Sequence, residues 1–111
     1  FLDPLPFGAN STPCDALWAD LPVLTCMGEE FAGQVAASLL ATLGVPELIT
    51  ASLADYRAQA LALSGSRERL AAVRSKIVQA RETSPLFDTA RFTRDLEALY
   101  LAATGRAKVR D

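Results

Sequence analysis

The residues with the clearest chemical potential lie in one short polar segment, Gly8 to Asp15, which reads Gly-Ala-Asn-Ser-Thr-Pro-Cys-Asp. Gly8 permits a backbone bend that a side chain would obstruct. Thr12 is a favourable N-cap, Pro13 suits the first helical position, and Asp15 is spaced to complete a capping box. The segment therefore predicts a loop from Gly8 to Thr12, followed by a helix that begins at Thr12 or Pro13.

A helix that starts after a parallel strand presents free backbone N–H groups and a positive dipole end, where α/β proteins hold phosphate. Asn10, Ser11 and Thr12 would add donors for a diphosphate, and Asp15 is a candidate acceptor for ribose hydroxyls. An ordinary well-capped helix uses the same residues, so both interpretations stay open. The segment has one Gly and no Lys, and matches neither a dinucleotide fingerprint nor a Walker loop. A diphosphate would need its cation from elsewhere in the protein or from a metal, and because no Lys or Arg precedes Arg57, we expect the upstream sequence to supply it.

The elements expected to position this segment form a strand, loop, helix, strand unit. Phe1–Asp3 predicts the end of a buried strand, Asp15–Asp20 a short helix, and Pro22–Cys26 a second strand. This unit is the building block of a parallel sheet. Two short strands leave open edges, so we expect further strands upstream of Phe1, in a longer protein.

The rest of the chain follows a helical period and predicts four helices, at Glu29–Leu43, Leu53–Leu63, Arg67–Glu82 and Thr89–Ala103. Their expected terminal residues are Gly44, Ser52, Ser66, Asp88 and Gly105. The predicted fold class is α/β. Residues 1–45 are expected to form the C-terminal half of a Rossmann-like lobe, and residues 46–111 a helical extension of it.

Three further side chains have structural and functional interpretations. Trp18 is expected to be buried against the sheet rather than to stack on a sugar, because large aromatic residues mostly serve cores. Glu29 and Glu30 are expected to favour the positive end of the following helix, although a carboxylate near a sugar stays open. Neighbouring helical positions do not supply the opposed carboxylates of a glycoside hydrolase.

Composition excludes several kinds of site. There is no His in the chain, which excludes His-containing zinc sites and Ser-His or Cys-His catalytic pairs within it. Cys14 and Cys26 are expected to be reduced and structural, as in a cytoplasmic protein. The longest weakly polar run, Phe31–Val45, is shorter than the roughly 20 residues of a membrane span. We therefore expect a soluble protein with no membrane partner and no bound metal.

Charge is divided unevenly along the chain. The first 56 residues hold seven of the thirteen Asp and Glu residues and none of the eleven Lys and Arg residues. The bases, from Arg57 to Arg110, alternate with acids at helical spacing and with few aromatic residues. This pattern is typical of a solvated helix face and not of a nucleic-acid interface.

At these residues the sequence resembles the C-terminal catalytic region of the O-linked N-acetylglucosamine transferase and SPINDLY family. The similar segments run in the family's order from Phe1 to about Leu101. They are Gly8-Ala9-Asn10-Ser11-Thr12, Asp15-Ala16-Leu17-Trp18, Leu21-Pro22-Val23-Leu24-Thr25, Gly28-Glu29-Glu30-Phe31-Ala32, Val35-Ala36-Ala37-Ser38-Leu39 and Ser84-Pro85-Leu86-Phe87-Asp88-Thr89.

The resemblance implies a GT-B glycosyltransferase that moves N-acetylglucosamine from UDP-N-acetylglucosamine to Ser or Thr hydroxyls of proteins, often behind tetratricopeptide repeats. It places the diphosphate on Asn10, Ser11 and Thr12 and the ribose on Asp15, with a sugar nucleotide as substrate and no permanent cofactor. Asn10 stands where the family usually has His, and Gln34 where it has Arg. The family's catalytic groups belong to sequence upstream of this chain, so no catalytic residue is expected here.

Two alternatives remain at this point. The same scaffold would also suit another donor, such as GDP-fucose, and a non-catalytic helical module that docks a partner protein would bind no nucleotide. For the glycosyltransferase interpretation, we expect the isolated 111-residue chain neither to transfer sugar nor to bind UDP tightly, and to cover its exposed sheet surface by self-association.

Overall fold

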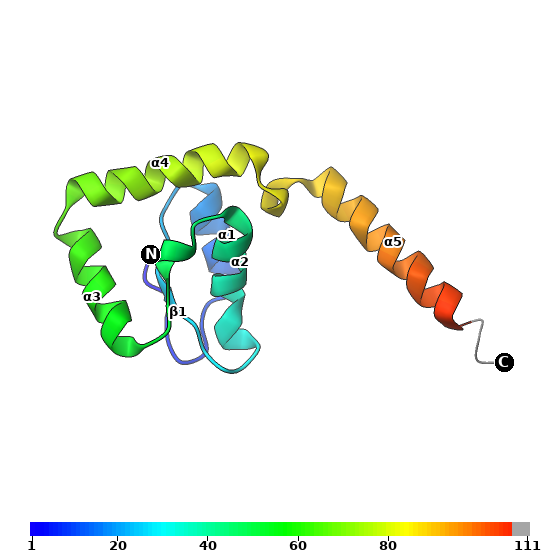
Figure 1. The fold of residues 1–111 in the computed structure, drawn as a ribbon, viewed down its shortest axis with the longest axis horizontal. Coiled ribbons are helices and arrows are strands. Elements are labelled where there is room, and N and C mark those ends of the chain that lie inside the picture. The colour runs from blue at the N-terminus through cyan, green and yellow to red at the C-terminus, as the bar shows by residue number, and fades with distance from the viewer. Residues whose placement is uncertain (108–111) are drawn as a thin grey trace.

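A computed structural model describes residues 1–107 and has a small parallel sheet at its centre (Figure 1). Strand β1 (Thr25–Cys26) pairs in parallel with β2 (Ile49–Thr50), with Thr25 opposite Ile49 and Cys26 opposite Thr50. Leu2 forms an isolated parallel bridge to Leu24 on the other side of β1. The chain therefore has the parallel arrangement expected of an α/β protein, with β1 in the middle.

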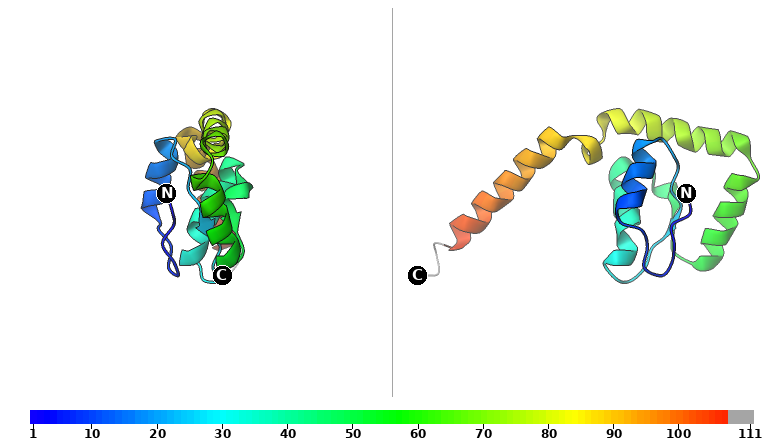
Figure 2. Two further views of the ribbon diagram at one scale, coloured as in Figure 1. Left: turned by 90° about the vertical axis from the view of Figure 1, so that its left-hand side faces the viewer. Right: turned by 180° about the vertical axis from the view of Figure 1, so that it is seen from behind.

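Helices surround this sheet. They are α1 (Ser11–Trp18), α2 (Val35–Leu43), α3 (Leu53–Ser64), α4 (Arg67–Thr83) and α5 (Thr89–Ala107), with short 3-10 turns η1 (Ala32–Gln34), η2 (Pro46–Leu48) and η3 (Pro85–Phe87). Helices α1 and α2 lie on one side of the strands and α3 on the other (Figure 1). Helix α4 crosses the end of the sheet opposite the loops that follow the strands (Figure 1). Helix α5 leads away from the rest of the molecule (Figure 2), which measures 61 × 30 × 18 Å.

The core joins both halves of the chain. Leu17 of α1, Leu40 of α2, Leu48 of η2 and Ile77 of α4 are completely buried in one cluster. Each such side chain contributes about 1.5–3 kcal/mol when it leaves water. Helix α4 is therefore held to the sheet unit by the same core that holds α1 and α2.

Most of the predicted helix ends are confirmed. The Ser52 hydroxyl accepts a hydrogen bond from the Asp55 N–H (3.1 Å). The Ser66 hydroxyl and the Asp88 carboxylate accept from N–H groups three residues further on (3.2 and 2.8 Å). Gly44 ends α2 with a φ of 85°, in the left-handed region that glycine tolerates best.

The predicted capping of α1 is wrong in detail. The helix begins at Ser11, one residue before the predicted start, and Asn10 occupies the N-cap position. No side chain makes a capping hydrogen bond there, so Thr12 and Asp15 do not form a capping box. The cause lies in the preceding loop, where Asn10 already has near-helical angles (φ −101°, ψ −62°).

Two other predicted helix boundaries are also wrong. Helix α2 begins at Val35 and not at Glu29, because the Gly28 N–H donates to the Gly33 carbonyl (3.0 Å) and closes a turn over the intervening acids. Glu29 and Glu30 therefore lie outside any helix. Helix α5 continues through Gly105 instead of stopping before it.

Trp18 differs most from its expected environment. Its side chain is 61% exposed, and its ring packs edge-on against Phe87 at 5.2 Å between centroids. It lies at the end of α1 on the outer surface, where Phe87 of η3 and Arg81 of α4 cover part of it. The expectation that Trp18 is buried against the sheet is therefore wrong.

Strand β2 was not anticipated, although Leu48-Ile49-Thr50 is an apolar, β-branched run between two helices. Within residues 1–107, no helix combines the length and the hydropathy needed to cross a membrane. The last residues of the expected helical extension, 108–111, lie outside the described part of the chain.

Candidate functional site

Three connecting segments meet at the carboxyl edge of the sheet. They follow Leu2, β1 and β2, and consist of residues 3–10, 27–31 and 51–52. The Met27 N–H donates to the Thr50 carbonyl (2.8 Å) and continues the strand pairing to this edge. In open α/β sheets this edge is where ligands bind.

The four residues proposed from the sequence come together at this edge. Asn10, Ser11 and Thr12 form the start of α1, and Asp15 lies one turn later on the face that Ser11 and Thr12 share. All four are exposed, and none of their side chains forms a hydrogen bond or ion pair within the described residues. The first N–H groups of α1 likewise have no intrahelical partner. The site thus presents unused donors and one free carboxylate.

The loop before α1 is held in place by Asp3, which sequence reasoning did not identify. Asp3 is 3% exposed, and its Oδ1 accepts from the Ala9 N–H (2.7 Å). Its Oδ2 accepts from the hydroxyl of Thr25 in β1 (2.7 Å). One buried carboxylate therefore joins the loop to the central strand.

The backbone of Asp3 extends this network to the other side of the sheet. Its N–H donates to the Leu24 carbonyl (3.0 Å), and its carbonyl accepts from the hydroxyl of Tyr56 in α3 (2.9 Å). Burial, and to a lesser extent the charge of Asp3, raises the pKa of the Tyr56 hydroxyl. Tyr56 is therefore kept as a donor, and α3 is tied to the strand end that carries the loop.

Three glycines allow the loop segments to pack against one another. Gly8 has a φ of +79°, and a Cβ at this position would lie 3.2 Å from the Ala32 carbonyl oxygen. A Cβ on Gly33 would lie 3.2 Å from Cα of Gly28 and 3.4 Å from the Pro6 carbonyl oxygen. Side chains at these positions would push the loop after Leu2 away from the loop after β1.

Two ion pairs of α4 lie on other parts of the surface. Lys76 contacts Glu47 of η2 at 2.5 Å, and this hydrogen bond lowers the pKa of the Glu47 carboxyl. Arg81 contacts Asp20 beyond the far end of α1 at 2.8 Å. Among the described residues, no ion pair or hydrogen bond links a Lys or Arg to the four candidate residues. The expectation that a diphosphate draws its cation from elsewhere stays a prediction.

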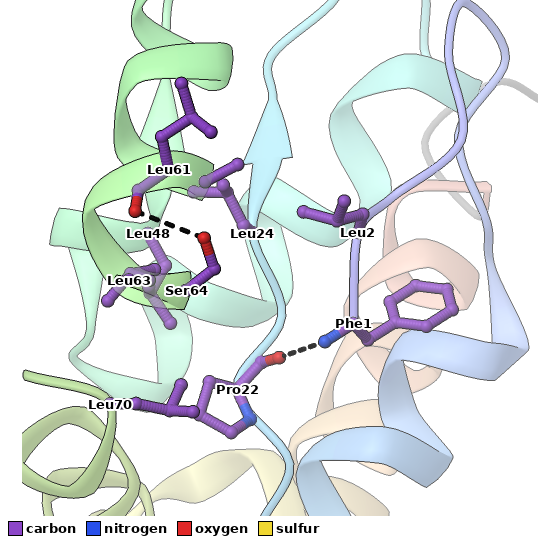
Figure 3. A pocket seen from close by; sticks show the side chains of 10 residues that line it. Phe1, Leu2, Pro22, Leu24, Leu48, Leu61, Leu63, Ser64 and Leu70 are labelled. Atoms are coloured by element: carbon purple, nitrogen blue, oxygen red, sulfur yellow. Dashed lines mark hydrogen bonds between the residues drawn. The ribbon is translucent and has the colours of Figure 1, made fainter. Parts of the chain in front are cut away.

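A hollow of about 380 Å³ lies away from the candidate site, between the amino-terminal parts of the strands and helices α3 and α4 (Figure 3). Its walls are formed mainly by apolar side chains, including Leu2, Leu24, Leu61 and Leu70. The hydroxyl of Ser64, which also lines it, donates to the Leu61 carbonyl (3.1 Å). None of the described side chains that line the hollow is ionisable, so its surface favours apolar contact and not acid–base catalysis.

Comparison with known proteins identifies the family of the chain. The sequence pattern described as glycosyl transferase family 41 matches residues 2–96. The chain belongs to glycosyl transferase family 41. The family match includes the whole sheet, the candidate donors and Asp3.

Two curated relatives of family 41 illustrate the similarity. A UDP-N-acetylglucosamine–peptide N-acetylglucosaminyltransferase of Caenorhabditis elegans is 38% identical over 90 residues, which cover 81% of this chain. A probable transferase of the same description, SPINDLY of Solanum lycopersicum, is 32% identical over 99 residues, or 89% of this chain. The chain spans only 8% and 11% of the length of these two proteins.

A solved family 41 relative confirms the fold. A mutant of the Thermobaculum terrenum O-GlcNAc transferase superposes with a TM-score of 0.81 at 32% identity, over 89% of this chain and 19% of that one. The chain therefore has the fold of part of a GT-B glycosyltransferase lobe followed by helices, as the resemblance implied.

Proposed function

We propose that this chain forms part of the donor-binding lobe of a glycosyltransferase that moves N-acetylglucosamine from UDP-N-acetylglucosamine to Ser or Thr hydroxyls of proteins. The two relatives described above are named as a UDP-N-acetylglucosamine–peptide N-acetylglucosaminyltransferase and a probable one, which supports this donor and a peptide acceptor. The observation that carries the proposal is the exposed group of Asn10, Ser11, Thr12 and Asp15, which have no partners within the described chain and stand at the carboxyl edge of a parallel sheet.

Each of these residues has a proposed role. The free N–H groups at the start of α1, with the side chains of Asn10, Ser11 and Thr12, bind the diphosphate. The Asp15 carboxylate accepts hydrogen bonds from the ribose hydroxyls. The diphosphate is also the leaving group, so donors at a helix start stabilise the negative charge that develops on it as the sugar departs.

The complete reaction needs groups outside this chain. We propose that an upstream lobe supplies the catalytic groups and a cation, and that tetratricopeptide repeats and a protein acceptor are further partners. We also propose residues 1–45 as the donor-binding half of the lobe and residues 46–111 as its helical extension. A cytoplasmic location is supported by Cys14 and Cys26, both free thiols in the described structure.

Calorimetric titration of the full-length protein with UDP and with GDP tests the proposal. UDP should bind, and Thr12→Ala should weaken this binding by about ten- to hundredfold, because it removes one hydrogen bond to a charged group. Thr104→Ala, at an exposed hydroxyl of α5, serves as the matched control and should change nothing. Preference for GDP would select the alternative donor GDP-fucose, and no binding of either nucleotide would favour a non-catalytic interaction module.

A further inference from the structure

We infer that Asp3 is a positioning residue for the donor site, acting through the backbone of the loop that leads into α1. The inference rests on the proposed function and deepens it, because Asp3 itself is buried and faces the loop from behind. The proposed reaction gives the Asp3 carboxylate no direct contact with the nucleotide. Its task is to hold the loop in place whether or not a nucleotide is bound.

Two N–H groups of the loop before α1 are already bonded within the protein. The Gly8 N–H donates to the Pro4 carbonyl (2.8 Å), and the Ala9 N–H donates to Asp3 Oδ1 (2.7 Å). Both groups are thus turned inward and satisfied. The next N–H groups, of Asn10 and the first turn of α1, are the ones that remain for an anion.

The carboxylate of Asp3 bonds to the central strand as well as to the loop. The Oδ2 atom of the same carboxylate accepts from the hydroxyl of Thr25, which is completely buried in the central strand. The two oxygens therefore join the loop to the buried central strand β1. A third anchor, from the Tyr56 hydroxyl to the Asp3 carbonyl, prevents the strand end from moving with the loop.

The loop passes close to the Asp3 carboxylate at Gly8. A Cβ on Gly8 would lie 3.5 Å from Asp3 Oδ2 and 3.2 Å from the Ala32 carbonyl oxygen. The loop therefore passes between Asp3 on one side and the turn after β1 on the other. Without the bond to Asp3, nothing on the strand side holds the Ala9 N–H, and the donors at Asn10 to Thr12 lose their fixed direction.

The experiment compares three variants of the full-length protein by UDP titration and by thermal melting. Asp3→Ala should weaken UDP binding by at least about tenfold. Asp3→Asn should stay within about threefold of the parent, since its amide keeps an acceptor for Ala9 and can donate to the Thr25 hydroxyl. Thr50→Val is the control. It removes another buried hydrogen bond, from the Thr50 hydroxyl to the Thr25 carbonyl (2.9 Å), without touching the loop, so affinity should hold although the melting temperature falls.

The inference would be overturned if Asp3→Ala and Thr50→Val lost equal UDP affinity, in step with their fall in melting temperature. Hydrogen exchange of residues 4–12 without nucleotide separates it from the proposed function. Asp3→Ala should speed exchange in that segment more than Thr50→Val does, even if the protein binds no UDP. If Asp3→Ala does not fold, Asp3→Asn should still show faster exchange there, because a neutral amide is a weaker acceptor, and unchanged exchange would contradict the inference.

Discussion

The guanidinium of Arg81 lies over the ring of Trp18, 5.3 Å from the ring centroid, and donates to the carbonyl oxygen of Trp18 at 2.5 Å. Its Nη1 also lies 2.8 Å from Asp20 Oδ1, a buried oxygen with no aligned hydrogen-bond partner among the described residues. A single side chain of α4 thus holds the last turn of α1, at the end opposite the candidate donor site. The contact links the helical part of the chain to the helix that would bind phosphate.

Arg81→Met is expected to lower the free energy of unfolding by about 1–3 kcal/mol, because it leaves a buried carboxylate oxygen without its cation and frees the Trp18 carbonyl. Urea denaturation measures the change. Lys76→Met is the matched control on the same helix. Its ion pair with Glu47 is largely exposed, so its loss should cost about 0.5 kcal/mol or less. Equal losses in the two variants would show that Arg81 is an ordinary surface residue.

Asp15→Ala should weaken UDP binding while leaving the free energy of unfolding within about 0.5 kcal/mol of the parent, because Asp15 makes no capping bond. Ser52→Ala provides the contrast. It removes a real cap of α3 and should cost about 1 kcal/mol without changing UDP affinity. Calorimetry and thermal melting of both variants decide the matter, and an unchanged UDP affinity in Asp15→Ala would disprove the ribose assignment.

Gly8→Ala should be more destabilising than Gly44→Ala, although both glycines have positive φ angles, +79° and +85°. At Gly44 an added Cβ meets nothing within 4 Å, so that variant reports only the backbone penalty, about 1–2 kcal/mol. At Gly8 the Cβ would also press on the Ala32 carbonyl oxygen at 3.2 Å. Denaturation of the two variants measures the difference, and only Gly8→Ala should also reduce UDP affinity.

The raised pKa of Tyr56 predicts a loss of stability in alkali. Below its ordinary value of about 10, the hydroxyl is protonated in both the folded and the unfolded chain. Above that value the unfolded chain loses the proton first, so the free energy of unfolding falls as the pH rises through the folded pKa. Tyr56→Phe should remove this part of the pH dependence and cost about 1 kcal/mol at neutral pH, for the lost bond to the Asp3 carbonyl. Denaturation at several pH values measures both effects. If the free energy of unfolding of Tyr56→Phe fell with alkaline pH as steeply as that of the parent, the assignment to Tyr56 would be wrong.

The isolated 111-residue chain should neither transfer sugar nor bind UDP tightly, and it should self-associate. Phe92, Leu99 and Tyr100 of α5 are each more than 60% exposed, and the apolar hollow of Figure 3 adds a second unpaired surface. Sedimentation over a range of concentrations, beside a UDP titration, tests both halves. A strictly monomeric chain would remove the association, and micromolar UDP binding would show that these residues suffice without another lobe.

The candidate donor site was accessible to sequence reasoning because its signals are local. Asn10, Ser11, Thr12 and Asp15 lie within six residues, and a helix start after a strand places them together whatever the rest of the fold does. The helix ends at Ser52, Ser66 and Asp88 were equally predictable. In each, a side chain bonds to a backbone group three residues away, so the interaction does not depend on distant packing.

The tertiary structure alone decided what holds that site in place. Asp3 bonds to groups 6, 22 and 53 residues away, and no local pattern marks a carboxylate whose partners are brought together only when the sheet and α3 assemble. The close approach of Gly8 to the turn near Gly33 is likewise a contact between separate loops. Trp18 was misassigned for the same reason. Its hydrophobicity predicted burial, but its position at the end of α1 left it on the surface beside Phe87 and Arg81, and that position follows from long-range packing.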